Sequence, residues 1–326
     1  MSTILPDGLT MRPPTIDDLQ IAYELYREHD LAFCGEDDLS LEDLRKHWTA
    51  LKHDLTRDQL LVFERDGQLI ANLYLEQLQY AKFFIGILVK PGYSDPRVGD
   101  LLFEMGERWA RERMVLAKPD ARITLNAWIP SNDQDALERY VRMGLQENRR
   151  YWDMEILMDE APAAPAWPEG VELHPFVPER DARAVFEMMD TAFSDHWGHL
   201  PGEFDEWRHR KIERPDFDPS LWFIAYANDQ PVGGSLCSID AQSWVDTLGT
   251  LRSWRRKGLG LALLLHSFGE FYCRGQRRVL LGVDSQNLTG AVRLYQRAGM
   301  HIKREKISFE KELRAGVELS TQVLTI

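Results

Sequence analysis

One stretch of the chain joins a strand, a basic turn and an apolar helix in an order that suits anion binding. Val, Thr and Leu without proline predict a strand over 243–251, and apolar residues at helical spacing predict a helix over 261–271. The turn between them reads Arg255-Arg-Lys-Gly258-Leu-Gly260. The first N–H groups of a helix lack intrahelical partners and carry partial positive charge, so this turn predicts a phosphate or pyrophosphate site.

Two common phosphate-binding loops do not fit this turn. A Walker A loop needs Gly-x-x-x-x-Gly-Lys-Ser/Thr, which is absent here, and a dinucleotide-binding loop needs a third glycine where Leu263 stands. The pattern that remains is Arg255-x-x-Gly258-x-Gly260. It resembles the acyl-CoA loop of the GNAT superfamily of N-acyltransferases.

A second motif follows the predicted helix. A strand is predicted at 278–284, and the run from Asn287 to Met300 resembles the superfamily segment Asn-x-x-(x)-Ala-x-x-Leu-Tyr-x-x-x-Gly-Phe/Met. The two motifs together imply an N-acetyltransferase that moves the acyl group of acetyl-CoA, its cosubstrate, to the amine of a small molecule by direct attack in a ternary complex. The other function class in view is a non-catalytic protein that binds acyl-CoA as a sensor or interaction module.

The resemblance implies which residues contact acyl-CoA. Backbone groups of the strand bind the thioester carbonyl and the pantetheine arm, and the turn with the helix start binds the pyrophosphate. These residues are Leu248, Gly249, Thr250, Arg255, Arg256, Lys257, Gly258, Leu259, Gly260 and Leu261. Asn287 either contacts the pantetheine or caps the following helix, and both interpretations are open.

Amine attack on a thioester requires a base, a donor to the carbonyl oxygen and an acid for the leaving thiolate. The resemblance implies Tyr295 as the acid; the other interpretation is an aromatic packed on an amphipathic helix. Asp246 is the candidate base, acting through water, and strand alternation would place it on one face with Trp244 and Leu248. The other interpretation of Asp246 is a solvent-exposed carboxylate.

The predicted acceptor loop carries His196 and Trp197, which resemblance to the superfamily makes candidate substrate-binding residues, although Trp197 equally fits a core position. No third ligand at metal spacing is visible, so we expect no metal site. The chain has three cysteines, too few and too scattered for a disulfide framework. Cys237 and Cys273 are expected to be buried small hydrophobes.

Composition excludes several classes of protein. The net charge of −13 argues against nucleic-acid or anionic-membrane binding. It suits a cationic substrate such as an amine, and it equally fits an acidic surface that only aids solubility. No apolar run approaches the roughly 18–20 residues that span a bilayer, and no signal peptide is evident, so we expect a cytoplasmic protein, monomeric or homodimeric.

An internal repeat divides the 326-residue chain into two related halves. We expect an α/β fold of two tandem GNAT-like domains, 1–160 and 169–314, each a mixed, mostly antiparallel sheet with helices on both faces. A Pro/Ala linker at 161–168 joins them, and a tail covers 315–326. The residues that repeat at a spacing of 155 are Asn132 and Asn287, Ala136 and Ala291, Tyr140 and Tyr295, and Gly144 and Gly299.

The first half carries an altered version of the acyl-CoA loop. Aligning Gly99 with Gly260 puts Arg97 where Gly258 stands, and two prolines enter the loop. Proline donates no N–H and Arg97 has a Cβ that crowds a ligand, so we expect this half not to turn over acyl-CoA, and passive binding of CoA there stays open. A decayed first half beside an intact second half resembles the mycothiol synthase branch of the superfamily. Gly282 stands where that branch has an aromatic residue, so the resemblance implies the superfamily and no particular acceptor.

Overall fold

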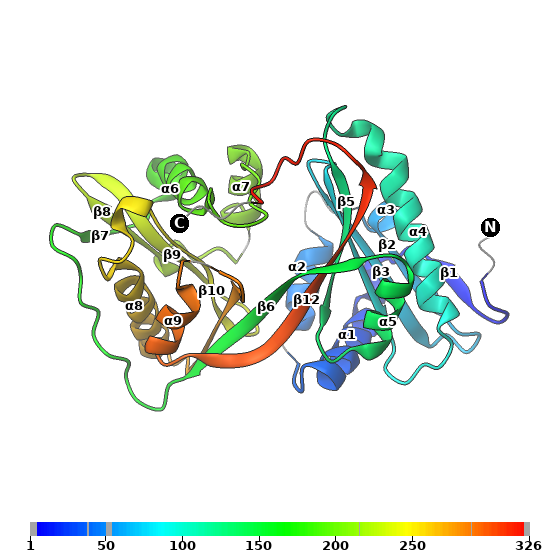
Figure 1. Cartoon of the computed structure of the whole chain (residues 1–326). Helices are drawn as coiled ribbons and strands as arrows, with labels where there is room; N and C mark the ends of the chain where they lie inside the picture. Colours follow the sequence, from blue (N-terminus) through cyan, green and yellow to red (C-terminus); the bar gives the residue numbers. More distant parts are fainter. Residues whose placement is uncertain (1–4, 38, 50–53, 215, 288, 323–326) are drawn as a thin grey trace. The chain divides into compact units, whose positions relative to one another are not determined.

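The computed structural model describes residues 5–37, 39–49, 54–214, 216–287 and 289–322. The chain forms two compact units: the first runs up to Tyr151 and adds Arg304–Leu319, and the second comprises Trp152–Lys303 and the segment from Ser320. Each unit is a mixed sheet with helices on both faces, which confirms the predicted fold class (Figure 1). The sequence predicted continuous domains, whereas the end strands of the two repeats, β6 (Gln146–Leu157) and β12 (His301–Arg314), each contribute residues to both units.

The sheet of the first unit has the strand order β1-β2-β3-β4-β5-β12. Its further strands are β1 (Thr10–Arg12), β2 (Gln59–Phe63), β3 (Leu69–Leu78), β4 (Lys82–Val89) and β5 (Ile123–Pro130). Its helices are α1 (Leu19–Phe33), α2 (Leu41–Trp48), α3 (Leu55–Asp58), α4 (Arg97–Arg113) and α5 (Gln134–Arg142), with short 3-10 turns η1 (Ile16–Asp18) and η2 (Met114–Leu116). One core cluster joins the sheet to α1 and α2, and another joins it to α4 and α5.

The sheet of the second unit has the strand order β6-β11-β10-β9-β8-β7. Its further strands are β7 (Glu172–Pro175), β8 (Trp222–Ala227), β9 (Gln230–Ile239), β10 (Ser243–Thr250) and β11 (Arg278–Asp284). Its helices are α6 (Pro178–Phe193), α7 (Phe204–Lys211), α8 (Leu259–Cys273) and α9 (Ala291–Arg297), with 3-10 turns η3 (Pro219–Leu221) and η4 (Arg252–Trp254).

Alternation along β8 builds the two faces of this second sheet. Trp222 and Ile224 belong to the cluster that α6 covers, whereas Phe223 and Ala225 belong to the cluster that α8 and α9 cover. Strand side chains point to opposite faces in turn, so one apolar strand supplies both cores. The unit therefore has α6 and α7 on one face and α8 and α9 on the other (Figure 1).

The predicted linker carries no helix or strand, and the ring of Trp167 packs edge-on against His266 of α8, with 5.8 Å between ring centroids. Within the described ranges, no helix has the length and apolar character needed to cross a membrane.

Candidate active site

Strands β10 and β11 part after a short stretch of pairing. They pair in parallel only at Ser243–Val279 and Trp244–Leu280, whereas β10 stays paired with β9 as far as Thr250. The N–H of Leu251 donates to the carbonyl of Val232 next to β9. The backbone N–H and C=O groups of successive strand residues point to opposite edges of the strand. Those of Leu248 and Thr250 therefore point to the edge of β10 that β11 leaves unpaired.

Gly249 has a different role from its two neighbours. Its backbone is in phase with Leu251, toward β9, so it is Leu248 and Thr250 that offer N–H groups at the opened edge. A Cβ on Gly249 would lie 2.9 Å from Cε2 of Phe193 and 3.0 Å from Sδ of Met189, both on α6. The glycine therefore lets α6 pack closely against the strand.

Asp246 lies at an irregularity of β10. The register with β9 shifts between Val245 and Thr247, which is a β-bulge. Val245 and Leu248 consequently pack on the same face, in the cluster under α8. The expected alternation that placed Asp246 on one face with Leu248 is therefore wrong, because a bulge adds one residue and changes the phase of the strand. Asp246 is exposed, and bulges often re-aim side chains next to active sites.

The turn before α8 is open. Arg256 and Gly258 adopt positive φ angles of 62° and 90°, and a Cβ on Gly258 would meet no atom within 4 Å. The first helical hydrogen bond runs from the N–H of Ala262 to the carbonyl of Gly258, at 3.0 Å. The N–H groups from Arg256 to Leu261 donate to no group among the described residues. This helix start has the geometry that binds phosphate groups.

Arg255 is already engaged within the protein. Its guanidinium donates to both carboxylate oxygens of Asp195, at 2.5 and 2.9 Å, and to the carbonyl of Ala192 at 2.8 Å. The Arg255 hydrogen bonds hold the pKa of Asp195 below its usual value. Arg255 thus ties the turn to the loop after α6, and the exposed charges of the turn are Arg256 and Lys257. The Lys257 ammonium lies 4.8 Å from the centre of the Trp254 ring.

Tyr295 lies on α9, in the cluster that also holds Leu248 of β10 and Val283 of β11. The residue is 8% exposed, and burial raises its pKa to about 12. Its hydroxyl has no hydrogen-bond partner in the described structure and is not one of the enclosed, unsatisfied polar atoms. The Tyr295 hydroxyl therefore reaches accessible space.

The equivalent tyrosine of the first unit, Tyr140, is held differently. It is 1% exposed, burial raises its pKa to about 12, and the backbone N–H of Ile87 donates to its hydroxyl. Ile87 takes the place of Leu248 when Gly99 is aligned with Gly260. In the first unit the N–H of Ile87 is thus bonded to the tyrosine hydroxyl, whereas the equivalent N–H of Leu248 in the second unit remains available to a ligand.

The altered loop of the first unit is also filled. Arg97 folds back on Asp95, to which its backbone N–H and its guanidinium both donate. A Cβ on Gly99 would lie 2.3 Å from Nε of the buried Arg139, whereas Gly260 faces Cδ1 of Leu294 at 3.2 Å. Arg139 and Leu294 are equivalent residues of the repeat. A guanidinium therefore covers the start of α4.

The predicted acceptor loop is held by the C-terminal tail. Gly198 donates its N–H to Thr321, Thr321 donates its N–H to His199, and the Thr321 hydroxyl donates to Ser194. His196 and Trp197 are half-buried in this loop, and burial lowers the pKa of His196. The charges of Asp195, Arg255 and Asp284 also act on the pKa of His196.

Asn287 forms a local turn. Its side-chain oxygen accepts from the backbone N–H of Thr289 at 2.8 Å and from the Thr289 hydroxyl at 2.5 Å. The N-cap residue of α9 is Gly290, with a φ of 82°. The Asn287 side chain therefore shapes the approach to the helix and is not the N-cap itself.

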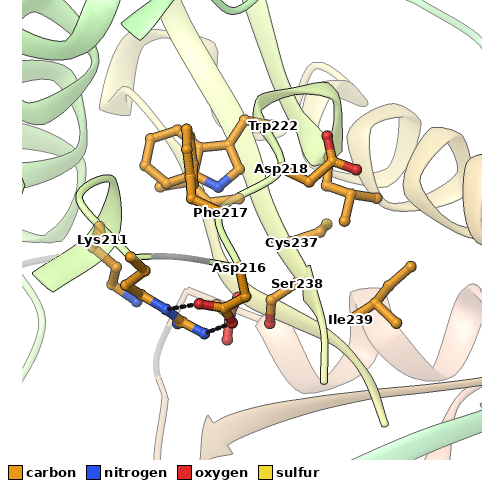
Figure 2. Close-up of a pocket in the computed structure, with 12 residues that line it drawn as sticks. Lys211, Asp216, Phe217, Asp218, Trp222, Cys237, Ser238 and Ile239 are labelled. Atoms are coloured by element: carbon orange, nitrogen blue, oxygen red, sulfur yellow. Dashed lines mark hydrogen bonds and ion pairs between the residues drawn. The ribbon is translucent and has the colours of Figure 1, made fainter. Parts of the chain in front are cut away.

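A cavity of about 130 Å³ lies beside Asp246 (Figure 2). Lys211 follows from the end of α7, Phe217 and Trp222 form an aromatic wall, and buried Cys237 lies on the strand side. The remaining lining residues are Arg214, Asp216, Asp218, Leu221, Leu236, Ser238 and Ile239. His196 and Trp197 do not line it.

The sequence analysis missed Lys211, because it belongs to a basic run at the end of a helix, which is an ordinary partner of the helix dipole. The expectation for Cys273 is wrong, since this residue is exposed. No group of three or more His, Cys, Asp or Glu side chains suited to a metal ion occurs in the described part of the chain.

Comparison with known proteins gives relatives along most of the chain. Residues 182–300 match the acetyltransferase (GNAT) family. A mycothiol acetyltransferase of Thermobispora bispora is 31% identical over 217 residues, which cover 63% of this chain and 73% of that protein. A crystal structure of a GCN5-related N-acetyltransferase from Sphaerobacter thermophilus matches with a TM-score of 0.86 and 34% identity, covering 98% of this chain and 100% of that one. A tandem GNAT protein from the clavulanic acid biosynthesis pathway shares the fold, with a TM-score of 0.73, 15% identity, and coverage of 95% and 100%.

Proposed function

This chain belongs to the GCN5-related N-acetyltransferase (GNAT) family, and from that premise we propose that it transfers the acetyl group of acetyl-CoA to the amine of a small molecule at a site in its second unit. The observation that carries this proposal is the open helix start, where the N–H groups from Arg256 to Leu261 have no acceptor among the described residues. Gly258 leaves the space above them free. A negatively charged pyrophosphate fits both features.

The opened edge of β10 gives the rest of acetyl-CoA a path. The strand covers about 13 Å from Thr250 back to Asp246, at about 3.3 Å per residue. The pantetheine arm lies along this edge, with the N–H groups of Leu248 and Thr250 as its donors. The thioester then reaches the region of Tyr295 and the bulge at Asp246. Arg256 and Lys257 attract the phosphates from the exposed side of the turn.

The residues at the bulge supply the proton transfers. Asp246, acting through water, takes a proton from the acceptor ammonium, and the lone pair of the neutral amine then forms the C–N bond at the carbonyl carbon. The C–S bond breaks, its electron pair stays on sulfur, and Tyr295 donates a proton to the thiolate. The Tyr295 phenolate recovers a proton from the nitrogen of the new amide, which carries one extra proton after attack, and Asp246 releases its proton to solvent. Tyr295 holds its proton at neutral pH, and burial, which raises its pKa to about 12, extends the pH range over which it does so. The acceptor lies in the cavity beside Asp246, and the loop with His196 and Trp197 closes the other end of the parted strands.

The first unit is a structural partner and not a second catalytic site. Tyr140 already binds the N–H of Ile87, and Arg139 covers the start of α4. The names of the relatives describe those proteins, and we do not assign mycothiol chemistry to this chain, since Gly282 leaves that substrate without its expected aromatic contact.

The test is calorimetric titration with acetyl-CoA, followed by thiol release over a panel of amines. Gly258→Trp should abolish binding, because an indole would fill the space of the pyrophosphate. The matched control is Gly275→Trp, which also replaces an open glycine at positive φ, at the other end of α8. Equal binding by both variants would overturn the proposal, and binding without thiol release from any amine would favour a sensor.

A further inference from the structure

The cavity beside Asp246 contains five charged side chains, and three of them are satisfied within the protein. Arg214 pairs with Asp216 and lies 3.5 Å from Asp240. Asp218 accepts from Arg274 at 2.7 Å and from the backbone N–H of Ser220 at 2.9 Å. These groups form a fixed polar rim, and Figure 2 shows Asp216 paired within it.

The side chains of the other two charged residues, Lys211 and Asp246, make no hydrogen bond or ion pair with any residue in the described ranges. They are near enough to interact electrostatically: burial lowers the pKa of Lys211, and the charge of Asp246 raises it again in part. An ammonium group withdrawn from water without a partner is costly, so a ligand that brings an anionic group to it gains free energy.

The rest of the lining is apolar and aromatic. Phe217 and Trp222 meet edge to face, with 5.1 Å between ring centroids, and Leu221 and Leu236 complete this wall. The cavity thus offers one unpaired cation, one unpaired anion and a hydrocarbon surface in a space of about 130 Å³. A small molecule with an amine, a carboxylate and an apolar side chain complements all three.

We infer that the acceptor is a small apolar amino acid, whose carboxylate binds the Lys211 ammonium while its amine faces Asp246. This inference rests on the proposed function, because it uses Asp246 as the base. It adds Lys211 as the residue that selects amines bearing an acidic group over plain amines. Lys211 binds the acceptor away from the bond that breaks, so its loss should raise the KM for the amino acid more than it lowers kcat.

The test compares amino acids with the amines that lack their carboxylate. The pairs are leucine with 3-methylbutylamine and phenylalanine with 2-phenylethylamine. The rate of thiol release from acetyl-CoA is measured with each compound as the acceptor. The native enzyme should prefer each amino acid in kcat/KM by at least about tenfold, the scale of one hydrogen bond to a charged group. Lys211→Met keeps most of the length of the side chain and removes its charge. It should abolish this preference and leave the KM for acetyl-CoA unchanged.

Arg210→Met is the matched control, since it removes the neighbouring exposed charge, which does not line the cavity. It should keep the preference. A native enzyme that prefers the plain amines, or a Lys211→Met variant that still prefers amino acids, would overturn the inference.

A measurement of leucine binding distinguishes failure of this inference from failure of the proposed function. Leucine is titrated calorimetrically into the native protein and into Lys211→Met in the presence of CoA, which carries no acyl group. Binding that depends on Lys211 without any thiol release would support the amino-acid site and refute the transfer reaction. Thiol release that does not depend on Lys211 would support the transfer reaction and refute the amino-acid site. The absence of both leucine binding and thiol release would refute both proposals.

Discussion

The internal repeat provides a direct test of the tyrosine assignment, because the chain carries the same residue in two environments. Tyr295 has a hydroxyl without a partner in the described structure, whereas the hydroxyl of Tyr140 accepts from the N–H of Ile87. The two substitutions Tyr295→Phe and Tyr140→Phe remove the same atom from equivalent helices. The proposed mechanism predicts that Tyr295→Phe lowers turnover and that Tyr140→Phe lowers thermal stability.

The magnitudes follow from these contacts. Tyr140→Phe leaves the buried N–H of Ile87 unsatisfied, which costs about 1–3 kcal/mol. In a domain of this size each kcal/mol lowers Tm by about 2–4 °C. Tyr295→Phe breaks no hydrogen bond within the protein, so its free energy of unfolding should change by less than about 0.5 kcal/mol. Loss of a general acid lowers kcat by about 10²–10⁴-fold.

The assays are thermal unfolding and thiol release under saturating acetyl-CoA. Tyr295→Phe should keep its Tm and its affinity for CoA and lose turnover, and Tyr140→Phe should lose Tm and keep turnover. Because the pKa of Tyr295 is raised to about 12, its protonated form persists as pH rises through 9, and its ionisation should not lower kcat there. Native turnover in Tyr295→Phe would refute the acid assignment, and equal kinetic losses in both variants would refute the distinction between the units.

Two further predictions concern charge and space. Arg255→Met leaves the Asp195 carboxylate, 15% exposed, without its guanidinium and should destabilise the protein by about 1–3 kcal/mol. Since Arg255 lowers the pKa of Asp195, this stabilisation is complete above pH 4 and is lost as pH falls below it, so urea unfolding should show a weaker acid dependence in Arg255→Met; an unchanged dependence would contradict the pairing. Gly99→Ala should cost about 1–3 kcal/mol because its Cβ meets Nε of Arg139 at 2.3 Å, and Arg139→Leu, the residue of the second unit, should relieve most of that cost. Additive losses of Tm in the double variant would show that the two residues do not compete for space.

Local features of the chain were readable from the sequence. Gly258 needs a positive φ, and the apolar run that follows has helical spacing, so the turn and the helix start were predictable from adjacent residues. The repeat that pairs Tyr140 with Tyr295 was equally visible. Both are patterns of residue type over a few positions, and these patterns constrain the backbone directly.

The roles of the charged and polar groups depended on contacts between distant residues. Arg255 is satisfied by Asp195, sixty positions away, so the charge that the motif offered to a ligand is used to hold a loop. Tyr140 and Tyr295 share one motif, yet only packing gave one of them a backbone partner. The bulge that moves Asp246 out of phase with Leu248 shows in the register with β9 and not in the residue types of β10.

The sequence by itself therefore determined the two repeats, the turn with its free amides and the family to which they belong, because each depends on short-range backbone preferences. The tertiary structure alone decided which arginine is already paired, which tyrosine keeps a free hydroxyl, how the end strands are divided between the units, and that Lys211 faces a cavity beside Asp246. The physical reason is that pairing and burial are properties of the space around a side chain. Residues from distant parts of the chain fill that space only after folding.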